Sequence, residues 1–317
     1  MRLLPTILAL LATSSPLALS KCTTCPCRAE PIASKDNLEI YTYHASPVPL
    51  TYQNATGLSF SPTKFTLIAT SSEAVLVDTP ISPDRGHALA DWIEATVPGR
   101  KLKAVYITRG HGDHFFAIPT IQSRFPGQQL EPTFFASFWA ALFPNLTAPV
   151  LTDITILDDG THHPHLSFHL TGAHNAHKEA KYELRAVPVG EADTSNSTVL
   201  HIPHLNAVVT GDVVYGHCYQ YLAENPTPAL RAQWLASIDK VAALGVEIVI
   251  PSHALAGEGY GWGHLAETKV YTRGFEELLE TSGSWEELEE GLVEGFPGRE
   301  GGFILRYSAQ SFFGAAF

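Results

Sequence analysis

The chain has 317 residues, of which 45% are hydrophobic and 16% charged, and this composition excludes an intrinsically disordered protein. Its formal net charge of -12 at pH 7 argues against a nucleic-acid partner, because the phosphate backbone would be repelled. A chain of this length can form one large domain or two small ones. Because the sequence contains no linker and no low-complexity tract, we predict a single domain.

Residues 1–20 have the features of a secretory signal peptide. Arg2 gives a short positive start, an apolar run follows, and Ala18-Leu19-Ser20 supplies the small residues that a signal peptidase recognises. The apolar run is too short to span a membrane, and no other stretch approaches the ~18 apolar residues that a spanning helix needs. We therefore predict a secreted, extracellular protein without membrane contact after cleavage. A Cys-rich segment (residues 21–37) would precede one domain (residues 38–317).

Four cysteines are present, three of them close to the predicted cleavage site. Cys22, Cys25 and Cys27 follow that site, and Cys218 lies far along the chain. In an oxidising compartment such a set favours two disulfide bonds over a zinc knot. We expect one of the first three cysteines to pair with Cys218, and the sequence does not say which.

Three N-glycosylation sequons fit the predicted export. They begin at Asn54, Asn145 and Asn196. The first two lie in loop-like surroundings and are therefore the better candidates.

In the first half of the chain, alternating and apolar runs predict strands at residues 38–43, 64–69 and 73–78, with the last two forming a hairpin. A helix should follow at residues 83–97, with Ser82 as its cap. Its predicted buried stripe consists of Ala88, Leu89, Trp92 and Ile93. A strand at residues 102–107, a helix starting over residues 115–123 and an apolar helix over residues 133–142 complete this half.

The second half repeats the theme of strands followed by helices. Strands are predicted at residues 166–170, 182–189, 198–201 and 207–210, a helix at 228–243 and a strand at 246–250. Two runs of strands, each backed by helices, predict an α/β or α+β architecture. His162, His163, His165 and His169 are expected to be exposed without a ligand. The tail after residue 282 is expected to add a helix and cover the core.

Residues 107–116 read Ile-Thr-Arg-Gly-His-Gly-Asp-His-Phe-Phe and form the most informative stretch. His111, Asp113 and His114 crowd into one tight turn between a predicted strand and a predicted helix. Such crowding costs solvation and charge repulsion unless a cation lies among the side chains, and His with Asp suits zinc or another divalent transition metal. A polar loop without a metal is the alternative.

This loop resembles the signature of the metallo-β-lactamase superfamily, T-H-x-H-x-D-H at the end of a strand. Thr108, His111, Asp113 and His114 match that signature, and Arg109 stands in place of its first histidine. The resemblance extends over about residues 41–256. It implies a four-layered αββα sandwich, in which two sheets pack face to face between helices.

The resemblance also implies two neighbouring metal positions. For the second position the set is complete: Asp113 and His114 from the loop, Asp212 in Thr210-Gly211-Asp212 as the bridging carboxylate, and His253 as the final histidine. Two carboxylates and two imidazoles are right in number and type for a divalent ion.

The first position has lost ligands. His111 is present, Arg109 replaces one histidine, and Glu191 stands where another is expected. A guanidinium cannot donate a lone pair, although a carboxylate can, so His111, Glu191 and Asp212 could hold a weak ion. The interpretation that we favour is that Arg109 supplies the missing positive charge by pairing with Glu191 or Asp212. We therefore expect one zinc ion rather than two.

The resemblance implies hydrolysis of a small-molecule acyl bond (lactam, lactone or thioester) by a metal-activated water. In that reaction Asp113 would orient the water or take its proton, and Arg109 would bind a substrate carboxylate or the developing negative charge. Tyr215, His217 and Phe138 are candidates for substrate contacts, with ordinary packing as an equal alternative for these side chains.

Two other functions stay open at this point. Because Arg109 and Glu191 replace ligand histidines, the chain could be a non-catalytic binding protein with the same fold. Because two histidines and a carboxylate also suit iron, it could be a mononuclear iron oxygenase. The substrate and the oligomeric state are not readable from the sequence.

Overall fold

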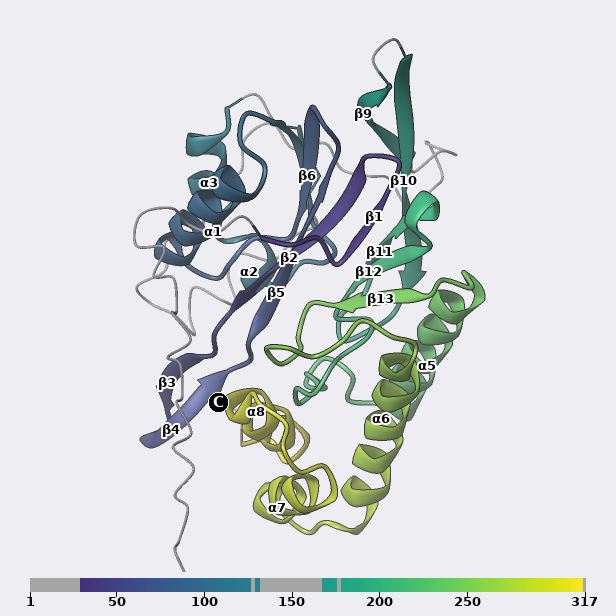
Figure 1. Ribbon diagram of the computed structural model, residues 1–317. Helices are drawn as coiled ribbons and strands as arrows, with labels where there is room; N and C mark the ends of the chain where they lie inside the picture. The colour runs from purple at the N-terminus through teal and green to yellow at the C-terminus, as the bar shows by residue number, and fades with distance from the viewer. Residues whose placement is uncertain (1–28, 127–128, 132–166, 176–177, 316–317) are drawn as a thin grey trace, which may run out of the picture.

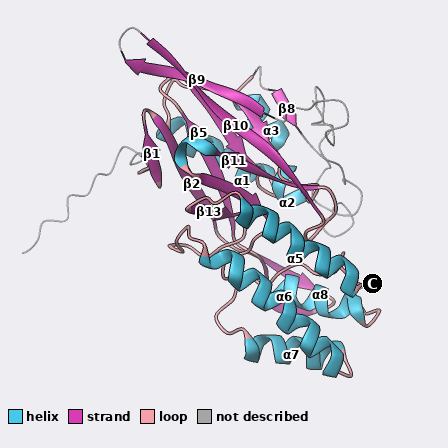
Figure 2. Ribbon diagram, turned by 90° about the vertical axis from the view of Figure 1, so that its right-hand side faces the viewer, coloured by secondary structure: helices cyan, strands magenta, loops and turns pink. Residues whose placement is uncertain are grey.

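The computed structural model describes residues 29–126, 129–131, 167–175 and 178–315. Several predictions lie outside these residues: the signal peptide, the helix over residues 133–142, and the residues Cys22, Cys25, Cys27, Phe138, Asn145, His162, His163 and His165. Within the described part, two sheets stand face to face and helices cover their outer faces (Figures 1 and 2).

The first sheet has six strands in the order β1-β2-β5-β6-β7-β8. The strands β5 and β6 form the predicted antiparallel hairpin, whereas β7 lies parallel to β6 on its other side. The bounds are β1 Ala33–Lys35, β2 Leu38–Ala45, β5 Thr63–Ala69, β6 Glu73–Val77, β7 Lys101–Tyr106 and β8 Gln129–Glu131. A separate two-stranded ribbon joins β3 (Val48–Tyr52) to β4 (Ala55–Phe60).

The second sheet has five strands in the order β13-β12-β11-β10-β9. Its last two strands in sequence, β12 and β13, are parallel, and the other neighbours are antiparallel. The bounds are β9 Ser167–Asn175, β10 Lys178–Gly190, β11 Ser197–Ile202, β12 Ala207–Gly211 and β13 Ile248–Pro251, with a short 3-10 helix, η1, at Pro203–Leu205.

The helices form the two outer layers. The first-sheet side carries α1 (Pro83–Thr96), α2 (Gly112–Phe115) and α3 (Ile118–Arg124). The second-sheet side carries α5 (Pro228–Ala243), α6 (Gly263–Thr281) and α7 (Trp285–Gly295). The last helix, α8 (Gly302–Phe312), contributes Phe303 and Ile304 to one core and Leu305 to the other.

Alternation along the strands explains the layers, because successive strand side chains point to opposite faces. In β2, Leu38 and Ile40 face the second sheet, while Tyr41 packs into the core under α1. In β12, Val209 faces the first sheet and Val208 packs toward α5. Burying each such side chain contributes about 1.5–3 kcal/mol.

Most predicted elements are present, with two corrections. The helix start predicted over residues 115–123 is wrong. The chain forms two short helices in this region: α2 ends at Phe115 and α3 begins at Ile118. The buried stripe of α1 is partly wrong, because Ala88 is exposed. Gly86 lies on the buried face instead, where a Cβ atom would come within 2.7 Å of the Ala117 Cβ atom.

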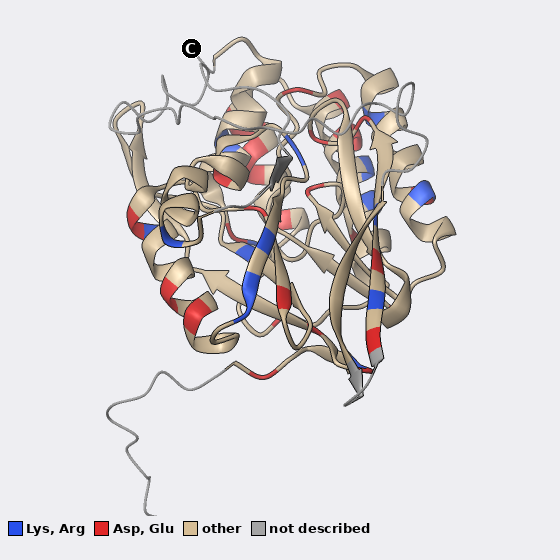
Figure 3. Ribbon diagram, turned by 90° about the horizontal axis from the view of Figure 1, so that it is seen from above, with Lys and Arg blue, Asp and Glu red and all other residues tan. Residues whose placement is uncertain are grey.

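Acidic and basic residues are interspersed along the helices and strands drawn in Figure 3. None of the helices in the described ranges is both long enough and apolar enough to cross a membrane. The sequon residues Asn54 and Asn196 are exposed at turns, with φ values of 64° and 58°. His169 is exposed on β9, as predicted. Cys218 is fully buried and forms no disulfide bond within the described residues, and its predicted partners lie outside them.

Candidate metal centre

The candidate site lies at the carboxyl ends of two parallel strand pairs, one in each sheet. Asp78 directly follows β6, and the loop of residues 107–111 follows β7. From the other sheet, Asp212 follows β12 and His253 lies two residues beyond β13. The sheets are joined at this edge by the backbone, because the Thr198 amide donates to the Thr108 carbonyl at 3.1 Å.

Asp78 fixes the loop that carries the motif. Its carboxylate accepts the Thr108 amide at 2.8 Å and the Thr108 hydroxyl at 2.9 Å. It also lies 2.8 Å from Nδ1 of His114. An ionised carboxylate can only accept, so the His114 Nδ1 atom carries a hydrogen, and Nε2 is the ring atom left to bind a metal. Asp78 therefore sets the tautomer of the central imidazole.

Two side chains of α2 and two that follow strands of the second sheet converge on one point. Nε2 of His114 lies 3.4 Å from an Asp113 oxygen and 3.5 Å from an Asp212 oxygen. Nε2 of His253 lies 3.1 Å and 3.0 Å from oxygens of the same two carboxylates. On the far side of its ring, His253 Nδ1 donates to the Pro62 carbonyl at 2.9 Å, which again leaves Nε2 directed at the carboxylates.

The donor set fits a divalent ion. Ligand atoms of Asp113, His114 and His253 all lie within 4.8 Å of one another, and all three residues are buried. Both Asp113 oxygens, His114 Nε2 and Asp212 Oδ1 are buried without a hydrogen-bond partner. Unpaired buried polar atoms are costly, and a shared cation would satisfy them together. Ligands at 2.0–2.2 Å from a tetrahedral ion lie roughly 3.3–3.6 Å apart, close to the separations within this cluster.

The charged side chains of this cluster shift one another's pKa values. Burial opposes ionisation of Asp113, but His114 and His253 outweigh burial and hold its pKa well below the usual range. Burial likewise disfavours the charged His253 ring, yet Asp212 and Asp113 raise the pKa of His253 to about 9. For Asp212, Arg109 and the two imidazoles overcome burial and lower the pKa. Both carboxylates therefore stay ionised at neutral pH.

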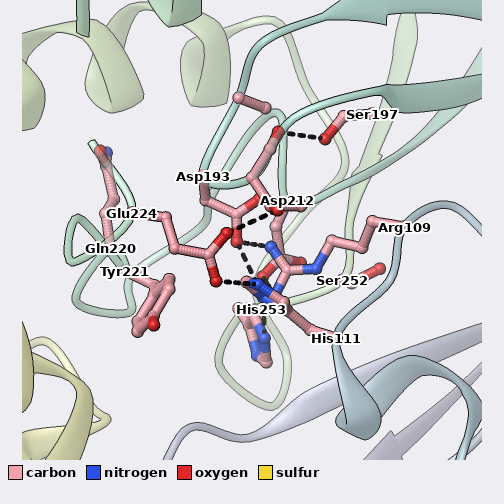
Figure 4. Close-up of polar contacts among 12 residues, drawn as sticks. Arg109, His111, Asp193, Ser197, Asp212, Gln220, Tyr221, Glu224, Ser252 and His253 are labelled. Carbon is pink, nitrogen blue, oxygen red and sulfur yellow. Dashed lines mark hydrogen bonds and ion pairs between the residues drawn. The ribbon is translucent and has the colours of Figure 1, made fainter. Parts of the chain in front are cut away.

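Arg109 lies beside this cluster, where its guanidinium is directed at two carboxylates (Figure 4). Nη2 lies 3.0 Å from Asp212 Oδ2, and Nη1 contacts Asp193 Oδ2. All three side chains are at most 3% exposed. The fixed positive charge therefore faces the same bridging carboxylate that the resemblance assigns to both metals.

His111 is turned toward a different carboxylate. Its Nε2 atom lies 2.9 Å from Glu224 Oε1, and Thr194 donates to the other Glu224 oxygen at 2.7 Å. Nδ1 of His111 lies 3.5 Å from Asp193. Both ring nitrogens of this remaining first-metal histidine thus face carboxylates rather than an open ligand position (Figure 4).

The structure corrects the role predicted for Glu191. Glu191 is partly buried, and in the described part of the chain it forms no ion pair with Arg109 or His111. Asp193, two residues later, provides the contact instead. Gly190 has a φ value of 96° at an irregular register of β10 with β11, and this turn directs Asp193 inward.

Of the predicted substrate-contact residues, Tyr215 lies at the site and His217 does not. Tyr215 donates to Asp212 at 2.8 Å and stacks on the His253 ring at a centroid distance of 5.6 Å. It lines a narrow cavity of about 10 Å³, roughly the room that one water molecule needs, together with Arg109, His111, Asp113 and His253. His217 faces a separate depression beside the start of α6.

Three further residues shape the site: Asp78, Asp193 and Glu224. Asp78 is the last residue of the strand predicted at residues 73–78. In the structure this strand, β6, lies parallel to β7, which leads into the motif, so the end of β6 marks where Asp78 lies. Asp193 and Glu224 lie in turns, where no periodicity shows which carboxylate points inward.

The comparisons with known proteins agree with this architecture. A family model described as "Metallo-beta-lactamase superfamily" matches residues 59–253. A metallo-beta-lactamase from Pontibacter korlensis is similar in structure, with a TM-score of 0.51 and 18% identity, over 78% of this chain and 99% of that one. Metallo-beta-lactamase IND-7 gives a TM-score of 0.51 and 19% identity, over 77% and 96% of the two chains.

No curated protein matches this sequence. At such identities the structural likeness shows the fold alone, and that fold is the predicted αββα sandwich. The family model covers more than half of the chain and ends at His253, the last of the four converging residues. The chain therefore belongs to the metallo-β-lactamase superfamily.

Proposed function

We propose that this protein is a secreted zinc-dependent hydrolase that cleaves a small-molecule acyl bond, namely a lactam, lactone or thioester. The observation that carries the proposal is the buried convergence of Asp113, His114, Asp212 and His253, in which polar atoms of the first three have no hydrogen-bond partner among the described residues. Its superfamily is commonly hydrolytic, and this cluster has the donor types that zinc prefers.

Each residue of the site would have its own role in such a reaction. A zinc ion held by the four residues would supply a Lewis acid for the acyl oxygen and a bound water of lowered pKa. Asp113 stays ionised and lines the cavity, so its carboxylate can accept a hydrogen bond from the attacking water and orient it. Tyr215 holds Asp212 in place by its 2.8 Å hydrogen bond.

Arg109 gives the site a permanent positive charge in place of a second ion. Because its guanidinium lies against Asp212 and lines the cavity, it partly neutralises that carboxylate and favours an anionic group in the substrate or transition state. We therefore propose a mononuclear centre, with Arg109, Asp193 and His111 occupying the space of the first metal.

A second candidate function is a non-catalytic binding protein that retains the superfamily fold. The favouring observation is that Arg109 is buried between Asp193 and Asp212, because such a pairing removes first-metal ligands. Hydrolysis assays separate this candidate from the first.

Export forms part of the proposal. It rests on the signal-peptide features of residues 1–20 and on the exposed sequon residues Asn54 and Asn196. Expression in a eukaryotic secreting host should place the protein in the medium with a mass that falls after enzymatic removal of N-glycans. Retention of the full-length chain inside the cell would contradict export.

The test of hydrolysis uses the full mature chain and a panel of lactams, lactones and thioesters. We expect turnover of at least one class, loss of turnover after chelation and recovery with added zinc. His253→Ala should abolish turnover, whereas His87→Ala, an exposed histidine on α1, should retain it. A folded, zinc-loaded protein that turns over no member of the panel would leave only the binding function.

A further inference from the structure

A second group of potential metal ligands lies on the surface, outside the candidate centre. Its members are His217 in the loop after β12, Glu258 in the loop after β13, and Glu267 in α6. Their ligand atoms all lie within 4.8 Å of one another. Nδ1 of His217 is 3.4 Å from Glu258 Oε1 and 3.7 Å from Glu267 Oε2. These residues line an open depression that also includes His264.

His264 provides an independent indication of a ligand. Its Nε2 atom lies 2.7 Å from the Gly259 carbonyl, and because a carbonyl only accepts, Nε2 carries the hydrogen. Nδ1 therefore presents a lone pair, 3.6 Å from Glu258 Oε1. This residue is 7% exposed, and Nδ1 has no hydrogen-bond partner. Histidines that bind metals characteristically donate their other ring N–H to a carbonyl in this way.

The carboxylate at the centre of the group is already oriented. Glu258 accepts the His217 amide at 3.0 Å and the Leu255 amide at 2.7 Å. Burial raises the pKa of Glu258, but these two amides outweigh burial and lower it. Glu267 contributes a buried oxygen, Oε2, without a hydrogen-bond partner. The ligand atoms of His217, Glu258 and Glu267 therefore face one another, and Nδ1 of His264 approaches the same Glu258 oxygen as His217.

The spacing suits a small divalent cation. Ligands at 2.0–2.2 Å from a tetrahedral ion are separated by roughly 3.3–3.6 Å. Nδ1 of His217 lies 3.4 Å from Glu258 and 3.7 Å from Glu267, and Nδ1 of His264 lies 3.6 Å from Glu258. Mixed imidazole and carboxylate donors favour zinc over magnesium or calcium, which prefer oxygen ligands.

We propose that His217, Glu258 and Glu267 form a peripheral zinc site separate from the candidate catalytic centre, with His264 next to Glu258 at its buried edge. An ion there would tie the loops after β12 and β13 to the start of α6. The same loops carry Asp212 and His253, and the Gly216 amide next to His217 donates to the His253 carbonyl at 2.8 Å. The peripheral site thus stabilises the segment that positions the last ligand of the main centre.

The experiment measures zinc bound per chain at a fixed free zinc concentration, for the full mature protein. The double variant His217→Gln/Glu267→Gln should bind one zinc fewer than the parent protein. The control Glu280→Gln changes an exposed glutamate of the same helix and should bind as much zinc as the parent. Because the result is a difference, it does not depend on occupancy of the main centre.

The two substituted side chains are each 46% exposed, so the double variant should fold, and circular dichroism verifies this. The single variant Glu267→Gln gives a second measurement, a weaker zinc affinity by at least about tenfold when one ligand is lost. The rise in melting temperature on adding zinc should also be smaller in the double variant than in the parent. Equal zinc content in the parent and the double variant would overturn the proposal.

Discussion

Nη2 of Arg109 lies 3.0 Å from Oδ2 of Asp212, and both side chains are almost completely buried. The same guanidinium contacts Asp193, so one fixed cation faces two carboxylates. In a low-dielectric interior such charges are stable only as a group, because removing one leaves the others uncompensated. Arg109 is therefore both a structural element and the reason why the first metal position differs from the superfamily pattern.

Arg109→Met should destabilise the protein, since it leaves Asp193 and Asp212 without their buried cation. We expect a loss of about 3–5 kcal/mol in the free energy of unfolding, measured by urea titration after chelation. Arg185→Met removes a half-exposed arginine from its pair with Glu183 and should lower the free energy of unfolding far less, because solvent screens that pair. If both variants lose the same small amount, the buried ion pair does not stabilise the fold.

Arg109→His should raise zinc binding by one ion per chain. The introduced imidazole would replace a group that cannot ligate, next to His111, Asp193 and Asp212. Quantification of bound zinc at saturating free zinc measures the change. The gain should disappear in Arg109→His/His111→Ala, which removes a second ligand. An unchanged zinc content in Arg109→His would show that the contact of His111 with Glu224 prevents His111 from binding a first zinc ion.

Gly211→Ala should weaken both the fold and the metal centre. Gly211 has a φ value of 54°, and a Cβ atom there would lie 2.6 Å from Thr108 Oγ1, the hydroxyl that anchors Asp78. We expect a loss of about 1–3 kcal/mol in unfolding free energy and a weaker zinc affinity, because Asp212 is the next residue.

Gly245→Ala is the matched control for this substitution. The φ value of Gly245 is 65° and nothing lies within 4 Å of the added Cβ atom. Any loss of stability in Gly245→Ala therefore comes from backbone strain alone. Zinc titration should show unchanged affinity in this control. Equal effects of the two substitutions on zinc affinity would contradict a specific role of the Gly211–Thr108 contact.

Glu73→Gln should destabilise the protein in a pH-dependent manner. Glu73 accepts the Thr171 amide at 2.7 Å and Lys103 Nζ at 3.2 Å, and so connects β6 to β9 of the other sheet. Burial raises the pKa of Glu73, but these donors outweigh burial and lower it. A lowered folded-state pKa stabilises the protein above the unfolded-state value of about 4.3, and this contribution is lost as the pH falls through the folded-state value.

Urea unfolding of wild type and Glu73→Gln at several pH values measures this effect. The difference should be about 1–2 kcal/mol near pH 7 and should shrink below about pH 4. Glu280→Gln, an exposed substitution, should show no such difference. A gap between wild type and Glu73→Gln that widens as the pH falls would contradict a lowered pKa of Glu73 in the folded protein.

The fold was largely predictable because strand alternation and helix periodicity reflect burial directly. The hairpin of β5 and β6 and the bounds of α5 follow from such patterns. The break between α2 and α3 was not predictable, because it depends on tertiary contacts such as the Ala117 amide donating to the Pro80 carbonyl. The face of α1 depends likewise on the close approach of Gly86 to Ala117.

The positions of the site residues were predictable where a sequence motif fixes the spacing between ligands. They were not predictable where the backbone of a turn determines which way a side chain points. Asp113 and His114 are neighbours in one motif at the start of α2, and Asp212 and His253 each follow a predicted strand at the same edge of a sheet. Glu191 and Asp193 are both acidic residues of one turn, and only the backbone after Gly190 determines that Asp193 reaches Arg109. His217 follows Asp212 closely, yet its side chain faces Glu258.

The most direct test of the main centre is a crystal structure of the zinc-loaded protein with anomalous scattering recorded at the zinc absorption edge. The proposal predicts an anomalous peak about 2.0–2.2 Å from Nε2 of both His114 and His253, with Asp113 and Asp212 as its other nearest protein ligands. Absence of a peak between these residues at saturating zinc, in a chain that is otherwise folded, would contradict the metal centre and the hydrolase function built on it.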